Sequence, residues 1–541
     1  MPNLPPNVNG KDFRDAIAQF ETAVSKEWVF TSDEDVALYR DAYSVFLGEP
    51  EEITASAAVA PSNVEEVQKV VKIANTFKIP IYPISTGKNL GYGGSAPNLS
   101  GSVVVDLKRM NRVLEVDDKR HFALVEPGVS YFDLYRYVHE RGLKVLLDFP
   151  DPGWGSPMGN SLDHGVGYTT PLMRDHFGSH CGMEVVLPNG ELIRTGMGAV
   201  PNSKTWQDYR YGAGPYVDGM FSQSNFGIVT KMGFWLNPLP EAHRVGIVTV
   251  PKRQDLIPLV EILNYLENSG ITTGLPELGA PVYGSFGSPP DPELAALMRK
   301  PGGATPAEME KYAEEKGRAF WSCRLPFYGP EKVIAAQWEH AQEKFSAIPG
   351  AKFQDGVNYK FPLSPEDLAK ARKVTVGVPD MSIFTIGARS PFNAHPSHGH
   401  VWFSPIVPRT GEAVLEAEEF FSKTSAELGL SMATGGAPLP TNFYSRAFIF
   451  IFGVMVSANP AENKKMREGF RKMIQLAGER GYTEYRTPPA FQGDVIATYS
   501  FNNHSLLRFH ETIKDAIDPN GILAAGRYGI WPKHLRGQKR A

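Results

Sequence analysis

Three of the chain's thirteen histidines lie within seven residues, in the stretch AHPSHGH at 394–400. His395, His398 and His400 form a candidate zinc site, because imidazole nitrogen is a preferred zinc ligand. Such a site needs three or four ligands in fixed geometry, and only His398 and His400 share a face of the strand predicted here. From the residues alone, zinc ligands and solvated loop residues both stay open.

Two other groups could bind an anion or move a proton. Tyr485 and Arg486 are adjacent, and a guanidinium is always charged. A structural ion pair is the more common role for such a residue pair. Asp151 precedes Pro152, and Asp-Pro is typical of a turn. Taken singly, each group has a structural explanation.

Two glycine-rich loops follow predicted strands, at residues 86–95 (TGKNLGYGGS) and 151–160 (DPGWGSPMGN). Glycine allows positive φ and close backbone approach, and successive N–H groups can bind phosphate. A Rossmann site needs a helix directly after the glycines, and no helical pattern follows Gly94; a P-loop motif is also missing. Two such loops in one domain favour a long ligand, and a dinucleotide is long enough.

The elements that must position these residues alternate between strands and helices. Residues 56–82 predict strand, helix and strand, and residues 131–140 predict a helix. Further helices are predicted at 256–268, 330–346 and 412–428, and the apolar run 447–456 predicts one buried strand. Asn237-Pro-Leu-Pro is a candidate domain boundary, and the pattern changes again near Tyr485. The sequence predicts an α+β protein of two domains whose tail returns to the first.

Composition excludes several classes of protein. The 541 residues are 42% hydrophobic and 21% charged, and the net charge of −4 gives no electrostatic reason to expect nucleic acid as a ligand. Cys181 and Cys323 are the only cysteines, too few for a disulfide framework, and they suit a reducing cytoplasm. The longest apolar run is half of what a membrane span needs. We expect a cytoplasmic protein that binds neither nucleic acid nor membrane.

Several motifs together resemble the vanillyl-alcohol oxidase family of FAD flavoproteins, in particular its oxidases of para-substituted phenols. The resemblance covers nearly the whole chain and is carried by residues 83–94 (PISTGKNLGYGG), 148–160 (DFPDPGWGSPMGN), 175–198 (DHFGSHCGMEVVLPNGELIRTGMG), 221–231 (FSQSNFGIVTK), 399–405 (GHVWFSP), 484–487 (EYRT) and 518–527 (DPNGILAAGR). It implies a two-domain FAD-linked oxidase fold: a non-Rossmann FAD-binding domain from residues 1–238 and 486–541, and a cap domain from residues 239–485.

The resemblance also implies roles for single residues. His400 matches the histidine that bonds covalently to the 8α-methyl of the flavin, which leaves His395 and His398 as loop residues and the chain without a metal. The family's upstream histidine, which activates this bond in some members, has no counterpart, since no histidine precedes His121. The other FAD contacts implied are Ser85, Gly87, Asn89, Gly91, Ser156, Asn160, Glu184, Ile228 and Arg527.

By the same resemblance, Tyr92, Tyr485 and Arg486 bind a phenolic oxygen. A phenol has a pKa of about 10, so ionising it at pH 7 needs roughly 4 kcal/mol. One guanidinium and two hydroxyl donors in a water-poor site supply stabilisation of that order. Asp151 matches the acid near the flavin N5 and the benzylic carbon, suited to act as base for attacking water, and Tyr168 lines the same site.

The function implied is an FAD-dependent oxidase of para-alkyl or para-hydroxymethyl phenols. Hydride passes from the benzylic carbon to the flavin, the para-quinone methide takes up water or forms an alkene, and dioxygen becomes hydrogen peroxide. The segment 198–212 looks shorter than its counterpart in octameric members, which favours a homodimer. The alternatives are a dehydrogenase that passes electrons to a cytochrome, a non-phenolic FAD oxidase of 2-hydroxy acids or sugars, and a zinc-binding protein.

Overall fold

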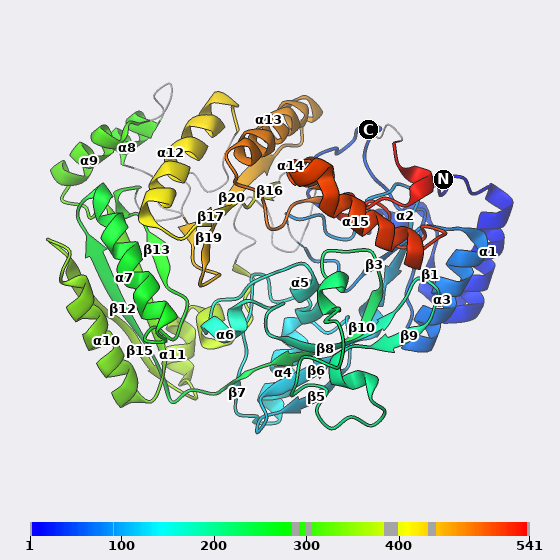
Figure 1. Cartoon of the computed structure of the whole chain (residues 1–541), viewed down its shortest axis with the longest axis horizontal. Helices are drawn as coiled ribbons and strands as arrows, with labels where there is room; N and C mark the ends of the chain where they lie inside the picture. Colours follow the sequence, from blue (N-terminus) through cyan, green and yellow to red (C-terminus); the bar gives the residue numbers. More distant parts are fainter. Residues whose placement is uncertain are drawn as a thin grey trace.

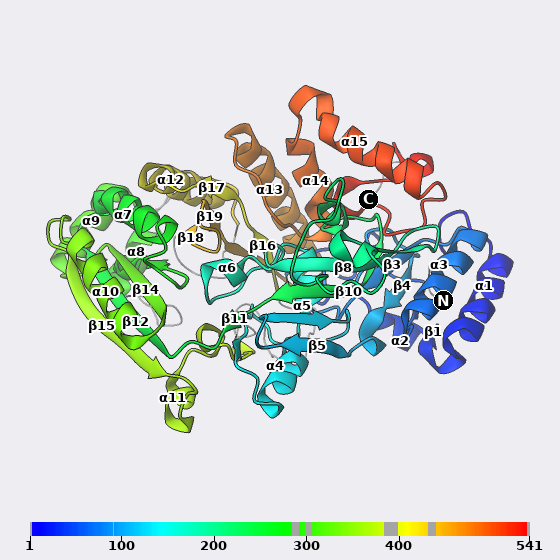
Figure 2. The ribbon, with the colours of Figure 1, turned by 60° about the horizontal axis from the view of Figure 1, so that its bottom comes forward.

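The computed structural model describes residues 3–89, 91–283, 291–298, 304–382, 399–430 and 440–537. Helices and strands are mixed throughout, as the α+β prediction requires. Figure 2 shows β12, β14 and β15 together at one end of the molecule and α1, α3 and β4 at the other. No helix in the described ranges is long and apolar enough to cross a membrane.

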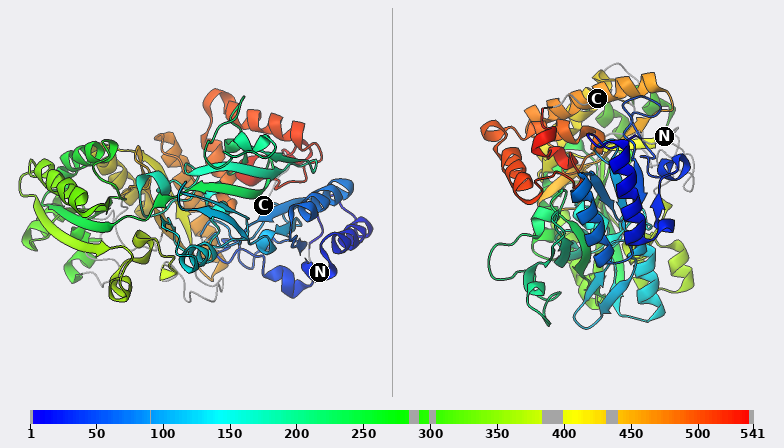
Figure 3. Two further views of the ribbon diagram at one scale, coloured as in Figure 1. Left: turned by 90° about the horizontal axis from the view of Figure 1, so that it is seen from below. Right: turned by 90° about the vertical axis from the view of Figure 1, so that its right-hand side faces the viewer.

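The first sheet holds the loop that carries Tyr92. Three parallel strands and one antiparallel edge strand form it, in the order β1 (Val29–Phe30), β2 (Ala57–Val59), β4 (Val103–Asp106) and β3 (Ile81–Ile84). Helix α3 (Val64–Phe77) begins at Asn63, whose side chain accepts from the Glu66 amide, as an N-cap residue does. Its buried stripe of valines packs in the same core as α1 (Gly10–Val24). Figure 3 shows these two helices (blue) side by side.

The second sheet is antiparallel and lies between the first sheet and the cap. Its order is β5 (Val113–Asp117), β6 (Phe122–Val125), β10 (Ile228–Trp235), β8 (His180–Val186) and β9 (Leu192–Arg194). Helix α4 (Tyr131–Glu140) has the predicted bounds, and a capping box between Ser130 and Asp133 fixes its start. Helix α5 (Pro157–Leu162) follows the short strand β7 (Val145–Leu146) and the second glycine-rich loop.

The C-terminal tail returns to the first sheet after α15 (Phe501–Ile517). The Ile81 amide of β3 donates to the Ile522 carbonyl at 2.7 Å, and the Ala524 amide donates to the Ile81 carbonyl at 2.7 Å. This pairing fixes the backbone just before Arg527. The tail thus pairs with the first sheet, and the contact joins residues about 440 positions apart.

The cap centres on a four-stranded antiparallel sheet. Its order is β13 (Glu277–Gly279), β14 (Trp321–Gly329), β12 (Ala242–Val250) and β15 (Lys352–Lys360), with α7 (Leu256–Asn268) and α10 (Glu331–Phe345) packed in the same core. Figure 1 shows both helices lying along this sheet. We propose 239–485 as the cap, as the sequence predicts.

Two small sheets connect this part to the site. Strand β16 (Gly399–Phe403) pairs with β20 (Phe452–Val456), while β17 (Ile406–Pro408) pairs with β19 (Ala447–Phe450). Helices α12 (Gly411–Glu427), α13 (Pro460–Glu479) and α14 (Gln492–Thr498) complete the region. The prediction of one strand over 447–456 was wrong. The chain changes partner strand at Ile451, and apolar side chains cover both halves, so hydropathy alone could not show the break.

A buried ion cluster joins the segment that contains α6 (Pro171–Arg174) to the cap. Arg174, at the end of α6, and Arg409, which follows β17, both pair with the Glu267 carboxylate of α7. All three side chains are 4% exposed or less. One carboxylate thus serves as the shared counter-ion of two cations that water does not reach.

Replacing Glu267 by alanine should therefore lower the free energy of unfolding by about 3–5 kcal/mol, because both guanidinium groups lose their counter-ion inside the protein. Denaturant unfolding of the holoenzyme measures this. The control is Glu366→Ala in α11 (Pro365–Lys370), whose partner Lys370 is exposed, and we expect that change to cost at most about 0.5 kcal/mol. Equal losses in the two variants would contradict the role given to Glu267.

Candidate active site

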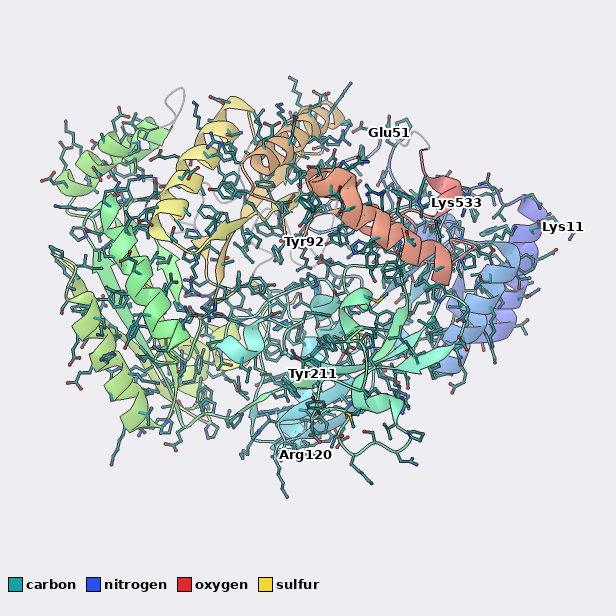
Figure 4. The ribbon with its side chains drawn as sticks, in the orientation of Figure 1. Lys11, Glu51, Tyr92, Arg120, Tyr211 and Lys533 are labelled. Carbon is teal, nitrogen blue, oxygen red and sulfur yellow. The ribbon has the colours of Figure 1, made fainter. Side chains whose placement is uncertain are left out.

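Two adjoining cavities lie where the first sheet, the second sheet and the cap meet. The first has a volume of about 220 Å³ and the second about 160 Å³. Ser85, Asn89 and Gly159 line both, so the cavities share a wall. Figure 4 labels Tyr92, which lines the first cavity, near the middle of the molecule.

Tyr92, Tyr485 and Arg486 meet in the wall of the first cavity, as the resemblance implies. The Arg486 guanidinium carbon lies 4.1 Å from the centroid of the Tyr92 ring. Hydrogen bonds join the Tyr485 side chain to both of the others. The Tyr92 hydroxyl also pairs with the Ser404 hydroxyl at 2.9 Å. Residues from the β3–β4 loop and from the segment before α14 thus form one group.

The electrostatics of this group favour an anionic ligand. Burial raises the pKa of Tyr92 well above 10, and burial also raises that of Tyr485, although Arg486 opposes the shift. Both hydroxyls therefore keep their protons and can donate them in hydrogen bonds. Burial alone would lower the pKa of Arg486, but Asp163 and the neighbouring tyrosines reverse that effect and the net pKa is raised. The group presents one fixed cation and two neutral donors.

Asp151 and Tyr168 line the same cavity. Burial raises the pKa of the Asp151 carboxyl, and a hydrogen bond with Tyr168 and the charge of Arg372 partly offset the rise. The Arg372 guanidinium carbon lies 4.7 Å from the Tyr168 ring centroid, and the guanidinium group pairs with Glu277 of the cap. The Asp151 carboxyl therefore lies in the cavity wall with a pKa above that of an ordinary aspartate.

A buried histidine network, which sequence reasoning missed, supports Tyr168. His176 Nε2 lies 2.9 Å from Asp148 Oδ2, and its Nδ1 lies 2.6 Å from the Asn160 amide and 3.1 Å from the Tyr131 hydroxyl. A carboxylate opposite Nε2 assigns the ring proton to that atom. The other oxygen of Asp148 accepts from the Tyr168 amide at 3.0 Å. Asp148 and His176 lie in motifs quoted above, but the network can be recognised only from their contacts in the folded structure.

His400 is fully buried in β16, between two aromatic rings. Its ring centroid lies 5.2 Å from that of Tyr43 and 4.3 Å from that of Trp402. Gly91 packs against this strand so closely that a Cβ on it would lie 3.1 Å from His400 and 2.6 Å from Trp402. The φ of Gly91 is also positive, at 73°. The glycine loop therefore touches the strand that carries His400, although His400 itself lines neither cavity.

The other predicted FAD contacts fall into three sets. Ser85, Asn89, Ser156 and Asn160 line the first cavity, and Gly87, Ile228 and Arg527 line the second together with Ser85 and Asn89. Glu184 lines neither, because its buried carboxylate pairs with Arg194 and Lys231 at 2.8 Å each. Gly91 contacts β16 as described above.

An elongated cofactor fits this arrangement. Gly159 lies in the wall shared by the two cavities, and a Cβ there would come within 2.2 Å of the Ser85 hydroxyl. Gly87, Gly91, Gly93 and Gly94 all have positive φ, which lets the loop backbone come close to a ligand. Within the ranges that the structure covers, no three His, Cys, Asp or Glu side chains are placed to hold a metal ion. His395 and His398 lie outside those ranges.

Comparisons with known proteins agree with this geometry. A model described as an FAD binding domain matches residues 55–196. Over 532 residues the chain is 32% identical to the flavoprotein subunit of 4-cresol dehydrogenase (hydroxylating) of Pseudomonas putida, with 97% of both chains covered. The structure of 4-ethylphenol oxidase from Gulosibacter chungangensis in complex with isoeugenol matches with a TM-score of 0.84 at 35% identity, covering 99% of this chain and all of that one.

The chain belongs to the vanillyl-alcohol oxidase and p-cresol methylhydroxylase family of FAD flavoproteins. Substrate-bound p-cresol methylhydroxylase also matches, with a TM-score of 0.83 at 31% identity and at least 98% of each chain covered. Membership in this family confirms the predicted two-domain FAD-linked fold and the FAD cofactor. The protein is an FAD-dependent oxidoreductase.

Asp163 is a further residue of the site that the sequence did not reveal. It follows α5 in a loop without a motif of its own, and it accepts hydrogen bonds from both Arg486 and Arg527. Ser404 was visible only as part of the motif GHVWFSP, with no role attached. Neither residue carries a local signal, since the hydrogen-bond partners of each side chain lie at least 74 positions away.

Proposed function

We propose that this enzyme oxidises para-substituted phenols, with dioxygen as the final electron acceptor and hydrogen peroxide as the by-product. The observation that carries the proposal is the meeting of Tyr92, Tyr485 and Arg486 in one cavity wall, with Asp151 lining the same cavity. Names of relatives point the same way, since one is a 4-cresol dehydrogenase and another a 4-ethylphenol oxidase.

The trio binds the phenol as its anion. Ionising a phenol at pH 7 needs roughly 4 kcal/mol, and hydrogen bonds to a charged group contribute about 1.5–3 kcal/mol each. Two neutral hydroxyl donors and one cation thus supply enough stabilisation. The phenolate pushes electron density toward the para position, which makes hydride loss from the benzylic carbon easier. Bound FAD supplies the hydride acceptor.

Asp151 serves the carbon end of the substrate. Hydride loss leaves a para-quinone methide, an electrophile at the benzylic carbon. An ionised Asp151 stabilises positive character there and takes the proton of a water that attacks it. Tyr168 holds the Asp151 carboxylate by a hydrogen bond. The Asp148 carboxylate in turn holds Tyr168 by accepting from its backbone amide.

A cytochrome acceptor is the second candidate, and the name of the Pseudomonas relative, a dehydrogenase flavoprotein subunit, supports it. The oxidase is favoured because His400 matches the histidine that links the flavin in the family's oxidases, whereas its cytochrome-linked dehydrogenases use a tyrosine. The packing of Gly91 against His400 supports a covalent link at this position. A homodimer and a cytoplasmic location remain predictions from the sequence.

Phenol oxidation is tested by anaerobic mixing with 4-ethylphenol, which should bleach the flavin absorbance, while glycolate should not. Tyr92→Phe should lower kcat/KM about 10- to 100-fold, because a hydrogen bond to the phenolate is lost. Peroxide formation against cytochrome c reduction then identifies the acceptor.

Tyr444→Phe is the matched control for this test. The Tyr444 ring lies 6.2 Å from that of Tyr485, but its hydroxyl donates to the His164 carbonyl at 3.2 Å. We expect it to keep kcat/KM within about threefold. If no para-alkylphenol bleaches the flavin absorbance, the proposed function is wrong.

The pH dependence of kcat/KM tests the role of Asp151. A base must be ionised, and burial raises the pKa of Asp151 above 3.8, so activity should fall as pH drops through a value above that of an ordinary aspartate. Asp380 raises this pKa and Arg372 lowers it. Asp380→Asn should therefore move the acidic limb to lower pH, and Arg372→Gln should move it higher. If neither change moves the acidic limb of kcat/KM, that limb does not report the ionisation of Asp151.

Acid precipitation tests the link at His400. We expect yellow colour to stay with the precipitated wild-type protein and to leave with the supernatant of His400→Ala. His340→Ala, a change on the outer face of α10, should keep the colour in the pellet. Flavin released by acid from the wild type would show that the bond does not form.

A further inference from the structure

Asp163 accepts hydrogen bonds from four side chains drawn from three distant parts of the chain. Its Oδ2 accepts from the Asn89 amide and from Arg486 Nε, both at 2.8 Å. Its Oδ1 accepts from Arg527 Nη2 at 2.5 Å and from the Tyr528 hydroxyl at 3.3 Å. Both carboxylate oxygens are therefore fully engaged, and the side chain is buried.

These partners belong to both cavities. Arg486 lines the first cavity, Arg527 lines the second, and Asn89 lines both. Asp163 itself lies in the wall of the second. It is thus a single anion set between the cation of the substrate cavity and a cation of the cofactor cavity.

The contacts hold one edge of the Arg486 guanidinium. Nε donates to Asp163, and Nη2 donates to the Asn89 side-chain oxygen. Nε and Nη2 form the same edge of the planar group, so two acceptors fix its plane. That plane lies over the Tyr92 ring, at 4.1 Å from its centroid. The rest of the guanidinium lines the first cavity beside Tyr485, with which Arg486 shares a hydrogen bond, and there it can meet a ligand.

The charge balance stays positive. Burial alone would raise the pKa of Asp163, but Arg527 and Arg486 lower it below its usual value, so the carboxyl is ionised. One carboxylate against two guanidinium groups leaves one net positive charge for a phenolate. A second buried carboxylate at this point would cancel that charge.

We propose that Asp163 is a positioning residue of the phenol site. It holds the edge of Arg486 so that the guanidinium meets the phenolate oxygen. Its bond to Arg527 links this orientation to the cofactor cavity. This rests on the proposed binding of phenols as anions. Two other roles for Asp163 give different results. An anion that acts only through its charge opposes phenolate binding, and a residue that only stabilises the fold leaves the ionisation of bound phenol unchanged.

The probe is 4-nitrophenol, which has no benzylic hydrogen to lose and whose anion absorbs visible light. Its titration on the holoenzyme gives the pKa of the bound phenol, which should lie below that of free 4-nitrophenol. In Asp163→Asn this bound pKa should rise by about one unit, a tenfold change, although the variant carries one more positive charge. Asp163→Glu keeps the charge but displaces the carboxylate, and it should raise the bound pKa in the same direction.

The control is Tyr528→Phe, which removes the longest of the four bonds and leaves both arginine contacts. It should keep the wild-type value. An unchanged bound pKa in both Asp163 variants, a lower one in Asp163→Asn, or loss of FAD from both variants would overturn the proposal, because each assigns Asp163 to another role. If wild-type protein binds 4-nitrophenol only in its neutral form, the proposed function fails, and the positioning role of Asp163, which rests on it, is overturned as well.

Discussion

A buried guanidinium must be paired, and the architecture around Arg486 follows from that requirement. An unpaired charge inside a protein costs several kcal/mol, so Arg486 cannot stand alone beside a cavity while it awaits a ligand. Asp163 and Asn89 pair it on one edge. The pairing is incomplete in charge, since Asp163 also serves Arg527. The site can therefore stay folded without substrate and still attract an anion.

Satisfying Asp163 requires that both ends of the chain come together. Asn89 lies in the loop after β3, while Arg527 follows the tail segment that pairs with Ile81 of the same strand. The two backbone bonds at Ile81 thus place a C-terminal cation within reach of an N-terminal loop. The contact of Gly91 with His400 and Trp402 brings β16 to that loop as well. One loop consequently touches Asp163, Arg486 and the strand that carries His400.

Regular elements could be predicted from the sequence because their signals are local. The bounds of α4 and α7 match the predictions, since the apolar periodicity lies within each helix and a capping box marks the start of α4. The run 447–456 was misread as one strand because its two halves are buried equally and differ only in their partner strands. The motifs identified Tyr92, Tyr485 and Arg486 as a group. Asp163 could not be found in this way, because its bonds span 74, 323 and 364 residues.

Three carboxyl groups near the cavity differ in their pKa shifts because their surroundings differ. Asp163 faces two arginines and is ionised. Asp151 has a hydrogen bond from Tyr168 and the charge of the more remote Arg372. These two groups offset only part of the rise in its pKa that burial causes. Glu484 accepts from the Ser404 amide at 3.0 Å, and burial raises its pKa well above 4.5, which favours the neutral form. Since Ser404 also pairs with Tyr92, an ionised Glu484 would place a negative charge behind the phenol-oxygen site. Burial without a cation keeps that charge away, and the net positive potential beside Arg486 is preserved for the substrate.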